Sequence, residues 1–214
     1  MNKSDRPSSI FHLPSSICVY DYENKLYINL TNRCSNACTF CIRSKQDGLN
    51  GHTLWLQREP TASEVIAALE KRNYKSSPEI VFCGYGEPAC RAAEIVEIGG
   101  FLKRNGVPTR LNTNGQGNLI NGRDITSELA AAVDTVSISL NNSTAERYQA
   151  VCRSRFGLAA YQGVLDFTRL CVPKFKRTVM TVVSLIGETE IEECRKICEG
   201  IGAEFRVRGY DSYT

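Results

Sequence analysis

Three closely spaced cysteines constrain this chain more than any other feature. Cys34, Cys38 and Cys41 have the spacing C-x3-C-x2-C and directly follow residues 26–31, which alternate as a strand does. Thiolates this close converge on one metal centre. An iron–sulfur cubane normally takes four cysteine ligands, and no fourth cysteine lies close in sequence, so one iron would stay open. An open coordination position separates catalytic from structural metal sites.

Two other interpretations of these cysteines stay open at this point. Free cysteines are often buried as small hydrophobic side chains. Three of them can also belong to a structural zinc site, although zinc ribbons favour two C-x2-C or C-x2-H knuckles and only Cys38 and Cys41 form one. The only histidines, His12 and His52, have no ligand spacing.

Composition places the chain among ordinary globular proteins. Its 214 residues are 42% hydrophobic and 23% charged, which suits one domain. We expect residues 1–16 to form a disordered N-terminal leader and residues 17–214 to form a single core domain. The net charge of +3 is too weak to indicate nucleic-acid binding. No apolar run approaches the length of a membrane span and no signal-peptide core is present, so we expect no membrane contact and a cytoplasmic location.

The remaining pattern alternates strands and helices. A hairpin is expected from residues 17–21 and 25–31, and later strands at residues 79–83, 108–112, 135–141, 176–185 and 204–208, with helices between them. Such alternation predicts an α/β fold with parallel strands and right-handed crossovers. Six units cannot complete an eight-fold barrel, so we expect a partial (β/α)6 TIM-type barrel. The alternative is an open doubly wound sheet.

Polar and glycine-rich segments follow the expected strands, where such folds place their reacting groups. The second strand ends in Gly84-Tyr85-Gly86-Glu87-Pro88, where glycines let the backbone approach a ligand and Glu87 offers a carboxylate to an ammonium group. A plain strand-to-helix turn explains the same glycines equally well.

Two further strand ends carry polar candidates. The third ends with Asn112 and Asn114, which suit a turn as well as a ligand. Along the fourth, Ser137, Ser139 and Asn141 share one face, and a buried polar stripe is costly unless it is hydrogen-bonded. A ribose or a carboxylate would satisfy that stripe, and so would water.

Residues 34–41, Cys-Ser-Asn-Ala-Cys-Thr-Phe-Cys, resemble the signature of the radical S-adenosylmethionine (SAM) enzymes, C-x3-C-x-aromatic-C, with Phe40 as the aromatic. The amino-acid sequence of residues 29–34 and 82–88 resembles that of the TatD-associated radical SAM proteins, and the resemblance spans residues 26–210. The resemblance implies that Cys34, Cys38 and Cys41 bind a [4Fe-4S] cluster whose open iron binds SAM. It also implies reductive cleavage of SAM to a 5′-deoxyadenosyl radical that abstracts hydrogen from an unidentified substrate.

The same resemblance assigns SAM contacts along the chain. Residues 84–88 match a Gly-Gly-Glu-Pro motif for the amino group of SAM, with Tyr85 replacing the second glycine. The end of the fourth strand, with Ser139 and Asn141, is implied to contact the ribose and carboxylate. Leu185 and Glu190 fit a G-x-I-x-G-x-x-E motif in which Val183 replaces the first glycine, although Glu190 also suits the first turn of a helix. At the end of the last strand, Val207 and Arg208 are implied to contact the adenine of SAM.

The implied partners are an external one-electron donor, such as flavodoxin or ferredoxin, and a substrate. A partial barrel leaves a lateral gap, which suits a large substrate such as a peptide, protein or nucleic acid. Two other classes remain open: an activase that installs a radical on a partner protein, and a non-catalytic metal or redox module. Cys194 and Cys198, one helical turn apart, are more typical of a core pair than of a second metal site.

Overall fold

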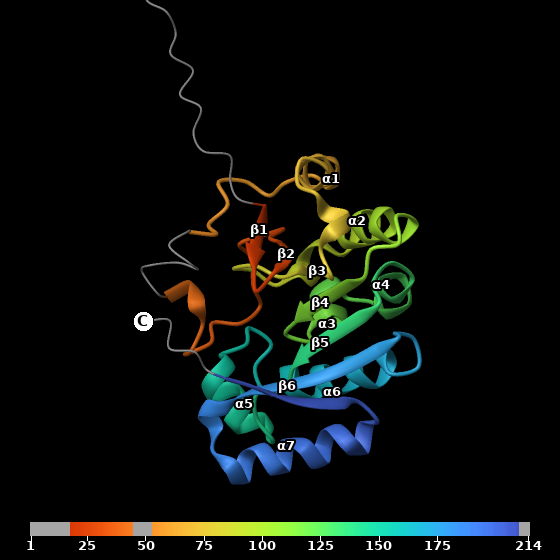
Figure 1. Ribbon diagram of the computed structural model, residues 1–214. Coiled ribbons are helices and arrows are strands. Elements are labelled where there is room, and N and C mark those ends of the chain that lie inside the picture. The colour runs from red at the N-terminus through yellow and green to blue at the C-terminus, as the bar shows by residue number, and fades with distance from the viewer. Residues whose placement is uncertain (1–17, 45–52, 210–214) are drawn as a thin grey trace, which may run out of the picture.

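One seven-stranded sheet organises the computed structural model, which describes residues 18–44 and 53–209 (Figure 1). The expected leader, residues 1–16, lies outside the described residues. Strands β1 (Val19–Tyr22) and β2 (Lys25–Ile28) form an antiparallel hairpin. From β2 onward every neighbouring pair is parallel, through β3 (Ile80–Phe82), β4 (Thr109–Thr113), β5 (Thr135–Ser139), β6 (Arg177–Val183) and β7 (Glu204–Arg208).

The order of the strands decides between the two predicted architectures. Neighbours in the sheet follow the chain from β1 to β7 without a reversal, whereas a doubly wound sheet reverses its order at a switch point. Within the described residues no pairing joins β7 back to β1, so the curved sheet stays open on that side. The six parallel strands therefore confirm the partial barrel, and the doubly wound alternative is wrong.

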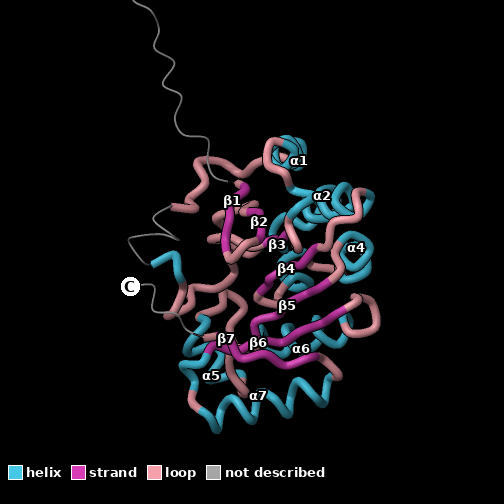
Figure 2. Tube along the Cα trace, in the orientation of Figure 1, coloured by secondary structure: helices cyan, strands magenta, loops and turns pink. Residues whose placement is uncertain are grey.

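In the part of the chain that the structure describes, seven α-helices connect the strands, and most of them line the outer face of the sheet (Figure 2). None of the helices within the described ranges combines the length and apolar character needed to cross a membrane. The helices are α1 (Ala62–Glu70), α2 (Ala92–Arg104), α3 (Gly117–Asn121), α4 (Thr126–Ala132), α5 (Ala145–Cys152), α6 (Ala159–Cys171) and α7 (Glu188–Ile201), with 3-10 turns η1 (Ile42–Ser44), η2 (Tyr74–Ser76), η3 (Pro88–Arg91) and η4 (Ser184–Ile186).

Local sequence explains where two helices begin and end. Helix α1 starts at a capping box in which the Glu64 amide donates to Thr61 Oγ1 at 3.3 Å and the Thr61 amide donates to the Glu64 carboxylate at 2.9 Å. Helix α5 ends at Arg153, whose φ of 47° is left-handed, and Gly157 has a φ of 61° before α6 begins. These two residues separate the region 144–171 into two helices.

The two faces of the sheet carry different side chains. Val136, Ile138 and Leu140 are fully buried in the main hydrophobic core beneath the helices, and Ser137 and Ser139 between them are half-buried on the other face. That inner face holds a second, smaller apolar cluster, hereafter the inner cluster, which consists of Tyr20, Tyr27, Leu54, Val81 and Tyr85. The inner face of the sheet therefore carries polar residues on β5 and aromatic residues on β1 and β2.

Candidate cofactor site

The cysteine loop follows β2 and is held on two sides. On one side the Glu87 amide, in the loop after β3, donates to the Arg33 carbonyl at 2.7 Å. On the other side the Ala37 and Thr39 amides donate to the carbonyls of Cys152 and Val151, each at 3.0 Å, at the end of α5. These backbone bonds fix the loop at the C-terminal edge of the parallel strands, which is where barrels of this kind place their chemistry.

All three predicted ligands lie in this loop and are half-buried. Burial raises the pKa of the Cys34 thiol to about 11 and also raises the pKa of Cys41. The thiols of Cys38 and Cys152 are close neighbours, and their interaction raises the pKa of Cys38 and lowers that of Cys152. Metal ligation therefore has to remove protons from the loop.

The thiols are not arranged around a single ion. Within residues 18–44 and 53–209, no three His, Cys, Asp or Glu side chains are grouped closely enough to hold one metal ion. A tetrahedral zinc ion needs such a group, because its bonds to sulfur are only about 2.3 Å long. In a cubane each cysteine binds a different iron, so its ligands are spread more widely. The chemistry of this donor set, three thiols in one loop, fits a cubane with three protein ligands.

The glycines after β3 have close neighbours, which are backbone atoms at Gly86 and a side chain at Gly84. A Cβ on Gly86 would lie 2.3 Å from the carbonyl oxygen of Thr31, and a Cβ on Gly84 would lie 2.0 Å from the Asn29 side-chain oxygen. Real Cβ atoms do not approach other atoms this closely. The glycines therefore let the loop after β3 pack against the chain that enters the cysteine loop, a different reason from the ligand approach that the sequence suggested.

Tyr85, which replaces a glycine of the family motif, belongs to the inner cluster. Its side chain is 4% exposed and meets the edge of the Trp55 ring at 5.2 Å between centroids. Leu54 and Val81 share that cluster. Because the tyrosine fills an apolar space on the inner face, the departure from the motif is accommodated without disturbing Gly84 and Gly86.

Glu87 links the ends of two strands. Its carboxylate, 3% exposed, accepts hydrogen bonds from Thr113 Oγ1 at 2.7 Å, from the Asn114 amide at 2.7 Å and from the Ala89 amide at 3.0 Å. Burial raises its pKa even though these three donors oppose the shift. Asn114 in turn donates from Nδ2 to Ser35 Oγ at 2.8 Å, inside the cysteine loop. The structure thus brings Glu87, Asn114 and the cysteine loop together, with Pro88 opening η3.

Four asparagine side chains leave buried oxygens without partners. Among the described residues, the side-chain oxygens of Asn29, Asn112, Asn141 and Asn142 accept no hydrogen bond; Asn29 directly follows β2, and the other three lie at or near the ends of β4 and β5. A buried polar atom left unpaired destabilises the fold by about 1–3 kcal/mol. Such atoms grouped at one edge indicate where a ligand supplies the missing donors. The residues present therefore fit a polar cofactor at this edge.

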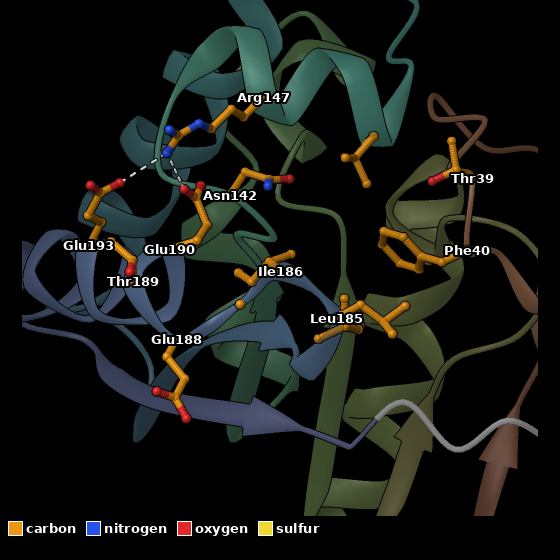
Figure 3. Close-up of a pocket in the computed structure, with 13 residues that line it drawn as sticks. Thr39, Phe40, Asn142, Arg147, Leu185, Ile186, Glu188, Thr189, Glu190 and Glu193 are labelled. Carbon is orange, nitrogen blue, oxygen red and sulfur yellow. Dashed lines mark hydrogen bonds and ion pairs between the residues drawn. The ribbon is translucent and has the colours of Figure 1, made fainter.

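A cavity of about 590 Å³ lies beside the cysteine loop (Figure 3), within the usual range for small-molecule sites. Phe40, Leu185 and Glu190, all predicted site residues, line it, whereas residues 84–88 do not. Sequence reasoning missed Asn142, which is 5% exposed; its position directly after Asn141 was the only signal. The full lining is Thr39, Phe40, Asn142, Arg147, Val151, Val183, Leu185, Ile186, Gly187, Glu188, Thr189, Glu190 and Glu193.

Glu190 has a structural role in this cavity. Its carboxylate accepts the Ser143 amide at 2.6 Å and forms an ion pair with Arg147, so it ties α7 to the start of α5. Burial acts to raise its pKa, but these donors outweigh burial and the pKa is lowered. The side chain points from the first turn of α7, as the helix-terminus interpretation expected, and it still borders the cavity.

The structure separates the two residues predicted on the last strand. Val207 pairs with Val182, a residue of the main core beneath the helices, and Arg208 pairs with Val183, which lines the cavity. Paired residues on neighbouring strands point to the same face of a sheet. Arg208 therefore lies on the cofactor side, and Val207 lies on the helix side.

An open parallel barrel whose first parallel strand runs into a three-cysteine loop defines a class of cluster-binding α/β proteins. The sequence matches the model of the radical SAM superfamily over residues 28–199. This chain belongs to the radical SAM superfamily, whose members bind a [4Fe-4S] cluster and SAM.

Solved structures share the fold at low sequence identity. The chain resembles SuiB of Streptococcus suis bound to SAM, with a TM-score of 0.65 and 17% identity, over 89% of this chain and 41% of SuiB. A radical SAM methyltransferase from Sphaerobacter thermophilus gives a TM-score of 0.56 and 16% identity, over 89% and 68%. TsrM from Kitasatospora setae, with cobalamin and a [4Fe-4S] cluster bound, gives 0.57 and 14%, over 85% and 36%.

The chain thus spans less than half of SuiB and of TsrM. A search of curated proteins finds no match.

Proposed function

We propose that this chain is a radical SAM enzyme in which Cys34, Cys38 and Cys41 bind a [4Fe-4S] cluster and leave one iron open to SAM. The observation that carries the proposal is the position of the cysteine loop, beside a cavity and at the edge of the sheet where the oxygens of Asn112, Asn141 and Asn142 are unpaired. When bound, the two cofactors supply reductive cleavage of SAM and a 5′-deoxyadenosyl radical that removes hydrogen from a substrate. The residues of the chain bind the two cofactors, orient them and shield them from side reactions.

Glu87 is proposed to bind the amino group of SAM. A carboxylate offers about four acceptor positions. Three are occupied in Glu87, two on one oxygen and one on the other, where the Asn114 amide donates. One acceptor position is therefore left for an ammonium group. Positive charge there would also offset the burial that raises the pKa of this carboxyl group.

The nucleoside end of SAM is proposed to lie toward the cavity. Phe40 and Leu185 supply apolar contacts there, and Leu185 is 58% exposed at its rim. The oxygens of Asn141 and Asn142 are acceptors suited to ribose hydroxyls or the adenine amino group. Ser139 and Arg208 face the same side of the sheet and extend this polar surface, together with Asn112.

The substrate and partners are proposed from the shape and the sequence. The side between β1 and β7 is open within the described residues, which supports access for a large substrate such as a peptide, protein or nucleic acid. The sequences of residues 29–34 and 82–88 support membership of the TatD-associated subfamily. Reductive cleavage of SAM needs single electrons, and we propose that a flavodoxin or ferredoxin supplies them to this enzyme in the cytoplasm.

Anaerobic reconstitution of the full chain tests the proposal. We expect four irons and four sulfides per chain, and 5′-deoxyadenosine when SAM and a strong reductant are added. Cys38→Ala should lose the cluster, whereas Cys171→Ala, a change in the core at the far end of α6, should keep it. An intact cluster that forms no 5′-deoxyadenosine would favour the non-catalytic redox module. Zinc in place of iron would refute the cluster itself.

A further inference from the structure

Cys152 is a fourth thiol beside the cysteine loop, although it is remote from that loop in sequence. It is the last residue of α5, its side chain is fully buried, its carbonyl accepts the Ala37 amide at 3.0 Å, and its thiol lies close to the thiol of Cys38. Neither the signature spacing nor the predicted SAM contacts include it. A buried thiol beside a cluster ligand can form a hydrogen bond to the ligand sulfur and so change the properties of the metal centre.

Two hydrogen bonds fix the position of Cys152, and its surroundings are buried. Asn141 Nδ2 donates to Cys152 Sγ at 3.3 Å, and both groups are buried. The Cys152 carbonyl accepts the Ala37 amide at 3.0 Å, one residue before Cys38. The Tyr148 ring, one helical turn earlier, is also fully buried, and its hydroxyl accepts hydrogen bonds from Gln116 at 2.8 Å and Asn36 at 3.3 Å. The thiol is therefore held against Cys38 by rigid neighbours.

We propose that Cys152 is a positioning residue for the cluster: its S–H donates to the Cys38 sulfur that ligates iron, and this hydrogen bond raises the reduction potential of the cluster. The inference rests on the proposed function. Iron takes the place of the proton on Cys38, so Cys152 becomes the donor of the pair. Hydrogen bonds to ligand sulfurs stabilise the more negative, reduced cluster, which is a principal way in which proteins set cluster potentials.

The geometry does not suit the other role open to a fourth thiol, ligation of the remaining iron. The four ligands of a cubane point to four different irons and diverge from one another. Cys152 instead lies close to the sulfur of another ligand, Cys38. A fourth protein ligand would also close the iron that SAM needs.

The test is a redox titration of reconstituted full-length protein, followed by electron paramagnetic resonance of the reduced cluster. Cys152→Ala removes the donor, Cys152→Ser keeps a hydroxyl donor, and Cys171→Ala removes a buried thiol at the opposite edge of the sheet. At one applied potential, we expect the ratio of reduced to oxidised cluster to fall about tenfold in the alanine variant, since a hydrogen bond to a charged acceptor has about this effect. For a one-electron couple this is a shift of about 59 mV. The serine and Cys171 variants should stay near the wild type.

A second readout separates tuning from a packing effect. In deuterated buffer, the reduced wild-type cluster should show a hyperfine coupling to one exchangeable deuteron that is absent in Cys152→Ala and present in Cys171→Ala. An unchanged potential in a fully loaded Cys152→Ala protein would overturn the inference and leave the proposed function standing. Loss of the cluster in both Cys152 variants would also overturn it, by making Cys152 an iron ligand. A wild-type chain that binds no cluster would overturn the proposed function, and this inference with it.

Discussion

Replacing Gly86 by alanine tests the claim that the glycine motif serves the packing of two loops. The added Cβ would lie 2.3 Å from the Thr31 carbonyl oxygen and 2.6 Å from that of Arg33. Both neighbours are backbone atoms, so neither can rotate away as a side chain would. The same two loops are joined by the Glu87 amide, which donates to Arg33 at 2.7 Å. Relief of the overlap therefore has to lengthen or break that hydrogen bond.

The magnitude follows from these two effects. Overpacking typically destabilises by about 1–3 kcal/mol, and loss of one backbone hydrogen bond adds about 1 kcal/mol. We expect Gly86→Ala to lower the free energy of unfolding of the cofactor-free chain by roughly 2–4 kcal/mol, or the melting temperature by roughly 4–16 °C at this chain length. Because the cysteine loop moves as well, reconstituted Gly86→Ala should also hold less iron than the wild type.

Gly200→Ala is the matched control. Gly200 lies in α7 and a Cβ there would meet nothing within 4 Å. Alanine favours helix over glycine by about 0.5–1 kcal/mol, so this variant should be slightly stabilised and should bind iron normally. Urea unfolding of both variants provides the comparison. If Gly86→Ala unfolds at the same urea concentration as Gly200→Ala, the packing argument for the motif is wrong.

Three further predictions concern single side chains. Burial raises the pKa of Glu87 in the folded chain, so the unfolded state loses this proton first and the folded state loses stability as the pH rises above the unfolded pKa of about 4.5. Glu87→Gln should remove this component, so its free energy of unfolding should fall less between pH 5 and pH 8 than that of the wild type. Parallel pH profiles of the two proteins would contradict the prediction. Asn142→Ala removes an unpaired buried oxygen, so the cofactor-free chain should be as stable as the wild type or more stable. The affinity of the cluster-loaded protein for SAM, measured by calorimetry, should fall about tenfold. An unchanged affinity would show that Asn142 is not part of the site. Thr61→Ala deletes the cap of α1 and should destabilise the chain by about 1 kcal/mol in urea unfolding without changing its iron content; reduced iron binding would show that α1 affects the cysteine loop.

Local sequence chemistry predicted the elements well. The last strand lies where it was expected, at Glu204–Arg208, and the capping box at Thr61 starts α1. Helix α3 (Gly117–Asn121) was not expected, because asparagine and glycine weigh against a helix. It forms where tertiary contacts enclose it: a Cβ on Gly117 would lie 3.0 Å from the Phe167 ring. Such contacts override local propensity.

The roles of the site residues were less accessible from sequence. Spacing identified Cys34, Cys38 and Cys41, but Cys152 comes beside them only because α5 ends against their loop. Glu87 was expected to face a ligand, and it also links β3 to β4 through Thr113 and Asn114. A sequence shows which donors and acceptors exist, and only their positions show which of them are already paired.

The sequence alone determined that this is a parallel α/β protein with three closely spaced thiols on its first crossover loop, because hydrophobic alternation and cysteine spacing are local properties of a chain. The tertiary structure decided that the sheet stays open, that Gly84 and Gly86 allow a close contact between two loops, and that Arg208 rather than Val207 lies on the same face of the sheet as Val183, which lines the cavity. Those outcomes depend on the register of neighbouring strands and on contacts between segments that are distant in the chain. Only the packing of the whole sheet brings such segments together.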